Sequence, residues 1–511
     1  MMSSKCSDCS SSGEQLSKEE DKNVSSTPTP PHVLILPFPL QGHIVPFLKL
    51  TELLCLAGLN VTLLNTEQIH SRLLQHSDVK ACFARFPGFR MEAISDGRSL
   101  SDPPPTVYQL EEELGLLNSI TKPVFKEALV SGRVVSGGMP PLTCIIGDAL
   151  LNFAMEVANE LEIPFFAFHV LNAATIWLVF SFPDLVDAGK FPFIGDEDDK
   201  IDCVKGLEGI LRIKDIPMGE EDKGVGTLVS VLIQSCKADA VIFNTFDDLE
   251  GAVLSHMRLK YPNTYAVGPV HMHVRSRLSR EPSERRQSVS SANIWQEDRS
   301  CMSWLDSQPS KSVVYVSFGS LTILKKDEFL ELWHGLVHSG KRFLWVMRPN
   351  LVEGLDWDDQ QPTKLVEEVG EGRTYVVRWA PQEEVLGHPA TGSFVTQCGW
   401  NSVLEAIVAG VPMICWPYWG EQSLNSRFVS ELYKVGVFMK DNDGLDRGTI
   451  ATTVNEVMEL RKGGLMESAA KMATLAKKAV GEGGSSYNDL DRLLDRIRLM
   501  AFKTPAKDYS Y

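Results

Sequence analysis

The chain has 511 residues, more than one ordinary hydrophobic core accommodates, and this length predicts two or three domains. Hydrophobic residues make up 43% and charged residues 23%, which excludes a chain dominated by disorder. The formal net charge of −16 argues against binding to nucleic acid or to an anionic membrane surface. Ten scattered cysteines form no disulfide framework and favour a reducing compartment, so we expect a cytoplasmic protein.

Residues 1–31 are interpreted as a disordered extension, because they are rich in Ser, Lys, Glu and Pro and lack the apolar run of a signal peptide. Cys6 and Cys9 form a C-x-x-C there, but no second pair supports a metal or redox site. The longest apolar stretch, residues 165–182, is interrupted by polar residues and bracketed by prolines. It is interpreted as a buried helix or strand–helix segment, and no membrane anchor is expected.

From residue 32 onward, short β-branched runs alternate with helical patterns, which is typical of parallel-sheet α/β folds. The strands predicted in the first half are residues 33–38, 61–65, 143–147 and 240–244. A Ser- and Arg-rich stretch at about residues 274–291 is interpreted as a linker. The strands predicted after it are residues 312–318, 343–347, 375–379, 393–396 and 412–416. Two such halves predict a cleft between the carboxyl ends of their sheets.

The common nucleotide-binding and metal-binding motifs are incomplete in this chain. Residues 37–42, after the first strand, lack the G-x-G-x-x-G of a dinucleotide site. Residues 335–341 spell G-x-x-x-x-G-K, but Arg342 replaces the Ser or Thr of a P-loop, and the segment ends a helix instead of starting one. No H-E-x-x-H motif is present. We therefore expect neither a metal nor another cofactor, and a phosphate-binding oxidoreductase stays a distant alternative.

Residues 397–402 (QCGWNS) are predicted to form a strand-to-helix turn. Gly399 would supply backbone freedom, and Asn401 and Ser402 are cap-type residues that open a helix. The free N–H groups at such a helix start bind anions, which suits a diphosphate. A capped helix packed on a sheet, without a ligand, explains the turn by itself equally well.

Further side chains around this turn suit the other parts of a sugar nucleotide. Trp379 offers a flat face for a base, and Glu405 lies one turn into the predicted helix, where it can accept hydrogen bonds from ribose hydroxyls. Glu421 and Gln422 follow the next strand and can do the same for a sugar.

Residues 379–422 as a whole resemble the donor-binding signature of plant secondary-product glycosyltransferases, the UDP-dependent glycosyltransferases of family 1. The opening WAPQ, the central CGWNS and the closing acidic residue plus Gln carry this resemblance. It implies a GT-B fold of the α/β class, with two Rossmann-like domains facing across a cleft. The implied division is residues 32–272 for the acceptor, 273–300 as the linker, 301–480 for the UDP-sugar, and 481–511 for a helix that packs back on the first domain, followed by a tail.

The resemblance also implies roles for individual residues. Trp379 would stack on uracil, Ala380 and Gln382 would lie beside the base and ribose, and Glu405 would bind the ribose hydroxyls. The residues implied around the phosphates are Ser320, Gln397, Gly399, Asn401 and Ser402. Those implied around the sugar are Trp400, Glu421 and Gln422, and a closing Gln is associated with glucose in this family.

Two positions depart from the family pattern. Gln397 stands where the family usually has a histidine, and Glu421 where it often has an aspartate. An amide donates hydrogen bonds but carries no charge, so phosphate binding is expected to be weaker.

His43 and Asp148 each follow a predicted strand, at the edge that faces the expected cleft. The resemblance implies that His43 is the catalytic base and Asp148 its partner, and an imidazole held by a carboxylate is a competent base near neutral pH. The implied reaction is an inverting transfer of glucose from UDP-glucose to a hydroxyl or carboxyl of a small lipophilic plant metabolite.

The first half resembles most closely family members that act on terpenoids, which implies a terpenoid aglycone as the acceptor, with a flavonoid or phenolic compound as the alternative. Phe38, Leu40, Phe165, Phe168, Trp177 and Phe180 are candidate apolar contacts, each with a core position as the more ordinary interpretation. A second alternative is a catalytically weak homologue that binds a small ligand. The expected partners are thus a UDP-sugar and a small hydrophobic acceptor, bound by a monomer.

Overall fold

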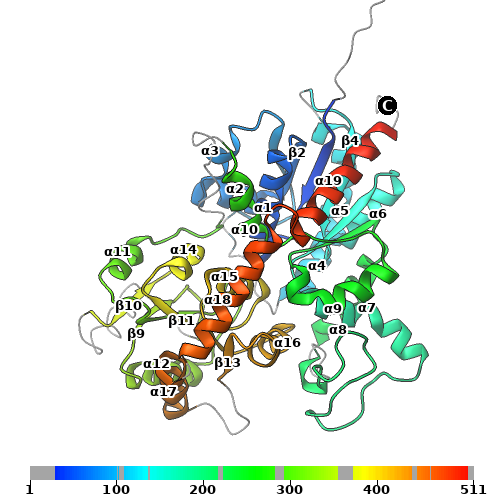
Figure 1. Ribbon diagram of the computed structural model, residues 1–511. Coiled ribbons are helices and arrows are strands. Elements are labelled where there is room, and N and C mark those ends of the chain that lie inside the picture. Colours follow the sequence, from blue (N-terminus) through cyan, green and yellow to red (C-terminus); the bar gives the residue numbers. More distant parts are fainter. Residues whose placement is uncertain are drawn as a thin grey trace, which may run out of the picture.

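The computed structural model describes residues 29–100, 102, 109–135, 138–216, 223–281, 293–354, 372–439, 446–460 and 462–503. Cys6, Cys9 and most of the predicted extension therefore lie outside the described residues. The described chain forms two α/β halves that lie side by side, with the C-terminal helix α19 (red) returning to the first half (Figure 1). The predicted α/β class with two Rossmann-like units is confirmed.

The first half is built on a seven-stranded parallel sheet in the order β3-β2-β1-β4-β5-β6-β7. Its strands are β1 His32–Leu36, β2 Asn60–Thr66, β3 Phe89–Ile94, β4 Leu142–Asp148, β5 Phe165–His169, β6 Ala240–Phe243 and β7 Thr264–Ala266. Its helices are α1 Gln41–Leu56, α2 Glu67–His76, α3 Val79–Phe83, α4 Leu110–Leu116, α5 Lys122–Val130, α6 Asn152–Glu160, α7 Ala173–Asp187, α8 Lys223–Ser235, α9 Asp247–Lys260 and α10 Val270–Leu278, with short turns η2 Leu117–Thr121, η3 Arg133–Val135 and η4 Ile213–Asp215.

The second half is built on a six-stranded parallel sheet in the order β10-β9-β8-β11-β12-β13. Its strands are β8 Val313–Ser317, β9 Arg342–Val346, β10 Thr374–Val377, β11 Thr391–Thr396, β12 Met413–Cys415 and β13 Gly436–Phe438. The helices that follow α10 are α11 Ser300–Asp306, α12 Lys326–His338, α14 Gln382–Gly387, α15 Trp400–Ala409, α16 Gln422–Arg427, α17 Arg447–Asn455, α18 Lys462–Ala479 and α19 Ser485–Lys503, with turns η6 Phe428–Leu432 and η7 Glu456–Leu460. Helix α19 contacts β4 and β7 of the first sheet.

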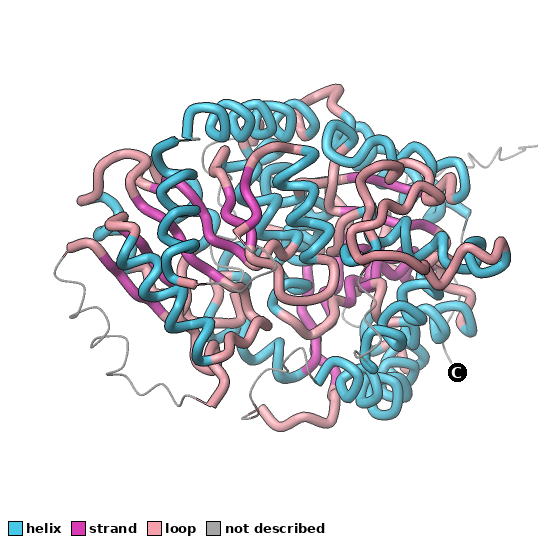
Figure 2. Tube along the Cα trace, turned by 90° about the horizontal axis from the view of Figure 1, so that it is seen from below, coloured by secondary structure: helices cyan, strands magenta, loops and turns pink. Residues whose placement is uncertain are grey.

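The strands are apolar on both faces because helices cover both faces of each sheet, as expected for parallel strands. In β1, Leu34 and Leu36 join one buried cluster, whereas Val33 and Ile35 join another on the opposite face. Figure 2 shows the strands of both sheets inside the molecule with helices around them. Both sheets therefore lie in the interior, and the loops that follow their strands are positioned by the strand ends.

All nine strands predicted from the sequence are present, and each ends within two residues of its expected limits. The apolar stretch at residues 165–182 is the strand β5 followed by α7, as one of the two interpretations proposed. The false P-loop pattern at residues 335–341 covers the end of α12 and the turn into β9, which confirms that it is a helix terminus. No helix within the described ranges is long and apolar enough to cross a membrane.

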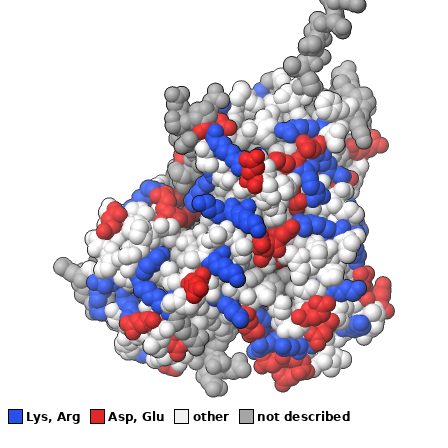
Figure 3. Space-filling model, in the orientation of Figure 1, with Lys and Arg blue, Asp and Glu red and all other residues white. Residues whose placement is uncertain are grey.

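The acidic net charge does not form one large patch on the face shown in Figure 3. Lys and Arg side chains alternate there with Asp and Glu side chains over both halves. Local ion pairs therefore form despite the net charge of −16. In one of them Arg258 Nη2 on α9 lies 2.8 Å from Asp489 Oδ2 on α19.

Candidate active site

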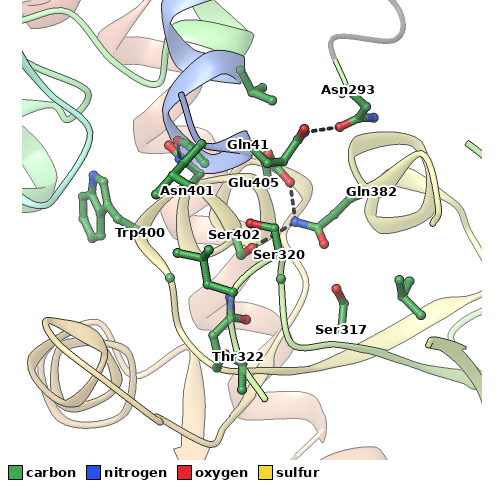
Figure 4. Close-up of a pocket in the computed structure, with 18 of the residues that line it drawn as sticks. Gln41, Asn293, Ser317, Ser320, Thr322, Gln382, Trp400, Asn401, Ser402 and Glu405 are labelled. Atoms are coloured by element: carbon green, nitrogen blue, oxygen red, sulfur yellow. Dashed lines mark hydrogen bonds between the residues drawn. The ribbon is translucent and has the colours of Figure 1, made fainter. Parts of the chain in front are cut away.

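A cavity of about 310 Å³ lies between the two halves, at the carboxyl ends of both sheets. The first half contributes polar residues of α1, including Gln41, His43 and Lys49, and the second half contributes most of the remaining polar wall. Figure 4 shows Gln41 facing the side chains of the second half. Every residue predicted to contact the UDP-sugar lines this cavity: Ser320, Trp379, Ala380, Gln382, Gln397, Gly399, Trp400, Asn401, Ser402, Glu405, Glu421 and Gln422.

The turn before α15 differs in detail from its prediction. The residue with positive φ is Cys398, at +66°, whereas Gly399 has a φ of −59° and is the N-cap of the helix. Asn401 and Ser402 lie inside the first turn, and neither side chain caps it. The prediction that Gly399 supplies the unusual backbone conformation and that Asn401 and Ser402 cap the helix is therefore wrong. The helix start still lies on the cavity wall, where its N–H groups suit an anion.

Asn401 is engaged across the cleft. Its side-chain amide Nδ2 donates to the backbone carbonyl of Gly42 at 2.6 Å, and Asn244 Nδ2 lies 3.4 Å from its Oδ1. Gly42 and Asn244 both belong to the first half. The start of the helix therefore also helps to hold the two halves together.

Gln397 lies against the loop that follows β8. Its Oε1 accepts a hydrogen bond from Thr396 Oγ1 at 3.3 Å, which directs the amide nitrogen Nε2 toward Gly319 and Gly399. Gly319 has a φ of +64°, and a Cβ there would lie 2.2 Å from Gln397 Nε2. Glycine suits this position because of its positive φ, and a Cβ there would also displace the amide of Gln397. The neutral donor of Gln397 therefore lies between the two loops proposed to hold the diphosphate.

The base and ribose side of the cavity has its own polar network (Figure 4). Gln382 Nε2 donates to Ser402 Oγ at 3.0 Å and to Glu405 Oε2 at 2.7 Å, and Tyr315 donates to Gln382 Oε1 at 3.2 Å. Burial raises the pKa of Glu405 to about 8, and the nearby Glu383 carboxylate adds to the shift. The raised pKa favours a protonated Glu405 carboxyl at neutral pH, and Gln382 holds that carboxyl in place on the cavity wall.

Trp379 is held from behind by a second indole. The ring of Trp295 stacks on it with centroids 5.9 Å apart and an interplanar angle of 27°. Trp379 is half-buried and lines the cavity, so part of its ring is accessible to a ligand. Pairing with Trp295 fixes the plane of the ring in advance of stacking on a base.

Two of the residues expected at the sugar, Trp400 and Gln422, have side chains that hydrogen-bond to the backbone of nearby segments. Trp400 Nε1 donates to the carbonyl of Asn244 at 2.9 Å, and its ring lies apart from Ser402 and Glu405 (Figure 4). Gln422 Oε1 accepts from the backbone N–H groups of Tyr418 and Trp419 at 2.9 and 3.1 Å. Because that oxygen is occupied, Gln422 offers its NH₂ group as the remaining donor.

Glu421 is the other acidic group on the sugar side. It is 8% exposed, and burial raises its pKa to about 7, although the nearby His43 acts in the opposite direction. The carboxyl therefore changes its protonation state within the neutral range.

His43 and Asp148 are in direct contact. His43 lies in the first turn of α1 and Asp148 ends β4, the strand beside β1, and His43 Nδ1 lies 2.7 Å from Asp148 Oδ2. Asp148 is buried, and Leu150 N–H donates to its other oxygen at 3.0 Å. With Nδ1 on the carboxylate, the free nitrogen of His43 is Nε2, which suits a general base.

A second, smaller cavity of about 80 Å³ adjoins the first and shares His43 and Glu421 with it. Asp148 lies in its wall, which is otherwise mostly apolar. Of the six apolar contacts considered from the sequence, only Leu40 lines either cavity, and the other five are buried in the core. The walls come instead mainly from the ends of β4 and β5 with the loops that follow them, from α7 and α8, and from the loop at Trp419.

Sequence reasoning also missed Arg348, which follows β9. It is 6% exposed and donates to the backbone carbonyls of Gly319 at 3.1 Å and of Thr322. Burial lowers its pKa to about 10, which leaves the guanidinium charged. Its charge therefore lies directly behind the loop that carries Ser320. The available signal was an arginine at the end of a buried strand, next to the expected cleft.

The structure has two Rossmann-like sheets with a cavity between them. An aspartate–histidine pair lies on one side of this cavity, and a polar wall suited to a nucleotide lies on the other. This combination defines a GT-B glycosyltransferase. The family model "UDP-glucoronosyl and UDP-glucosyl transferase" matches residues 289–467. A 7-deoxyloganetic acid glucosyl transferase from Catharanthus roseus is 47% identical over 479 residues, which are 92% of this chain and 98% of that one. The chain belongs to the UDP-glycosyltransferase family and is a UDP-glycosyltransferase.

Two further proteins extend the comparison. A myricetin 3-O-rhamnoside 1,2-glucosyltransferase from Crocosmia x crocosmiiflora is 40% identical over 483 residues, 92% of this chain and 96% of its own. The crystal structure of a UDP-glucose: anthocyanidin 3-O-glucosyltransferase in complex with UDP superposes with a TM-score of 0.74 at 26% identity, covering 92% of this chain and 100% of that one.

Proposed function

We propose that the protein is an inverting UDP-glucosyltransferase in which His43 is the catalytic base. The observation that carries the proposal is the 2.7 Å contact between His43 and Asp148, on the wall that also faces the start of α15. Asp148 holds the ring and stabilises the imidazolium that forms when Nε2 takes a proton.

The reaction that fits this geometry is a direct displacement. His43 Nε2 removes the proton of the acceptor hydroxyl as that oxygen forms a bond to the anomeric carbon of glucose. The bond from that carbon to the diphosphate breaks, and UDP leaves from the opposite face, so an α-linked donor gives a β-glucoside. The N–H groups at the start of α15, together with Gln397 and Ser320, stabilise the charge that develops on the diphosphate.

Glucose is the proposed sugar because of the donors and acceptors that the cavity offers. Gln422 presents its NH₂ group, and Glu421 presents a carboxyl for sugar hydroxyls. On the other side of the diphosphate, Trp379 with Ala380 would hold uracil, and Glu405 with Gln382 the ribose. We propose the domain limits given above on the same basis, with residues 32–272 binding the acceptor and 301–480 the donor.

A small, largely apolar acceptor suits the second cavity, whose wall includes His43. A terpenoid aglycone is the proposed class, supported by the relative named for 7-deoxyloganetic acid. The relative named for a myricetin rhamnoside favours a flavonoid as the second candidate.

The test is mass spectrometry of the products formed from UDP-glucose and a mixed panel of terpenoid and flavonoid aglycones. UDP-galactose, UDP-xylose and UDP-glucuronate are run beside UDP-glucose. We expect a glucoside with UDP-glucose and little product with the other donors. Ligand binding without release of UDP, for every aglycone, contradicts the proposal and favours a small-ligand-binding homologue.

A further inference from the structure

The cavity beside His43 contains a second histidine for which the proposed reaction has no role. His169 is the last residue of β5, which pairs with β4, and it lines the same 80 Å³ cavity as Asp148. The adjacent strands β1, β4 and β5 thus bring His43, Asp148 and His169 to one edge of the sheet.

Hydrogen bonds determine which nitrogen of His169 carries the proton. Ser235 Oγ donates to the carbonyl of Leu232 at 2.6 Å and lies 3.3 Å from His169 Nε2. A hydroxyl has one hydrogen, so Ser235 Oγ accepts its second bond from Nε2–H. Nδ1 therefore carries a lone pair and no hydrogen.

The surroundings keep this ring neutral and fixed. His169 is 1% exposed, and its ring stacks on Phe243 with centroids 5.0 Å apart and contacts the edge of Phe180. Burial lowers the pKa of His169 to about 3, so Nδ1 stays unprotonated at neutral pH.

Two polar atoms in this wall lack hydrogen-bond partners in the described part of the chain. One is His169 Nδ1, and the other is Oγ1 of Thr175, whose side chain belongs to α7 and lines the same cavity. Buried polar groups are nearly always hydrogen-bonded. Because both of these residues line the cavity beside His43, the two unpaired atoms favour a ligand that supplies the missing partners.

We propose that His169 Nδ1 accepts a hydrogen bond from a second hydroxyl of the acceptor, with Thr175 beside it as a further polar contact. The inference rests on the proposed function. The hydroxyl that reacts has one hydrogen, which goes to His43, so a different hydroxyl must donate to His169. A nitrogen lone pair repels an ether oxygen or a carboxylate at the same place, so this subsite selects diols over their monomethyl ethers.

The test compares hydroquinone with 4-methoxyphenol, which share one reactive hydroxyl and differ at the second position. With 4-methoxyphenol, His169 Nδ1 stays without a hydrogen-bond donor. We therefore expect the kcat/KM of the wild type to be about 10-fold lower for 4-methoxyphenol than for hydroquinone. His169→Phe keeps an aromatic ring against Phe243 but removes the acceptor nitrogen. We expect this variant to lose the preference through a higher KM for hydroquinone. Thr175→Val, which has nearly the same shape, is expected to reduce the preference in part.

His273→Phe is the matched control. His273 is buried, and its Nε2 has no hydrogen-bond partner within the described ranges, but it lies on α10 and lines neither active-site cavity. We expect this variant to keep the wild-type preference. The inference is overturned by an unchanged preference in both His169→Phe and Thr175→Val, or by a wild type that turns over only acceptors with a single hydroxyl. Absence of any glucoside from the whole panel overturns the proposed function itself.

Discussion

Asn401 in the second half donates its side-chain amide to the carbonyl of Gly42 in the first half at 2.6 Å. Gly42 directly precedes His43, and Asn401 lies in the first turn of α15. The proposed base and the proposed diphosphate site are therefore connected across the cleft through adjacent residues. The neighbouring Trp400, whose indole donates to the carbonyl of Asn244 at 2.9 Å, reinforces this connection.

Asn401→Ala is expected to lower kcat/KM for UDP-glucose by roughly 10-fold, because it removes a donor near the diphosphate and the contact that positions α1. Steady-state kinetics with a saturating acceptor measure this change. Asn488→Ala is the control, since Asn488 on α19 also donates to a backbone carbonyl, that of Gly483 at 3.2 Å, but is itself exposed and lines neither cavity. Equal activity of the two variants would show that the bond across the cleft has no part in catalysis.

His43→Ala is expected to lower kcat by about 10²–10⁴, the usual contribution of a general base. The affinity for UDP, measured by calorimetry, should change little, since the donor site lies mainly in the second half. Near-wild-type turnover would disprove the assignment of His43 as the base.

Asp148→Asn tests the partner of the base separately. An amide has nearly the shape of the carboxyl but cannot stabilise an imidazolium, so kcat should fall by roughly 10–10³. Because Asp148 is buried and accepts a bond from Leu150 N–H, the thermal midpoint of the variant is measured in parallel. A fall in kcat without a fall in stability supports the catalytic role, whereas unchanged kcat contradicts it.

Much of the site could be predicted from the sequence, because its residues directly follow strands that have a clear apolar pattern. His43 and Asp148 could be assigned to the same sheet edge because each follows a buried strand, and the carboxyl ends of parallel strands meet at one edge. Three strands were not predicted. The half-buried β3 mixes charged and apolar residues, and the three-residue strands β7 and β13 carry almost no periodic pattern, whereas the equally short β12 lies within an apolar run at residues 412–416.

Other features depend on contacts between distant residues, which periodicity does not encode. The cap-type character of Asn401 suggested a local hydrogen bond within its own helix. Its side chain instead donates to Gly42, which is 359 positions away in the sequence. His169 stands within an apolar run and was interpreted as part of a buried segment. Its unpaired nitrogen is visible only once Ser235 and the cavity are in place.

Glu421 predicts a dependence of stability on pH. Burial raises its pKa from the ordinary value of 4.5 to about 7, so the folded state binds a proton that the unfolded state releases. Its contribution to stability is full below pH 4.5 and is lost as the pH rises through about 7. The loss in the ligand-free enzyme is on the order of 3 kcal/mol.

Glu421→Gln should therefore show a smaller fall in thermal midpoint between pH 5 and pH 8 than the wild type. Differential scanning fluorimetry across that range measures the slope. Glu127→Gln, at an exposed carboxyl on α5, is the control and should leave the slope unchanged. Identical slopes for wild type and Glu421→Gln would contradict the raised pKa.

Gln397 is the position where the chain lacks a charge that its family usually supplies. Its Oε1 is held by Thr396, and its Nε2 faces Gly319 and Gly399. In Gln397→His, the imidazole adds positive charge beside the diphosphate when it is protonated.

Gln397→His is therefore expected to lower the Kd for UDP by about 3- to 10-fold at pH 6 and less at pH 8, because the imidazole loses its proton over this interval. Gln397→Ala, which removes the donor, should raise the Kd at both pH values. Calorimetric titration with UDP separates the two cases. If Gln397→His binds UDP no more tightly than wild type at pH 6, the charge of Arg348 behind the Gly319 loop already suffices for the diphosphate, and the glutamine is no handicap to donor binding.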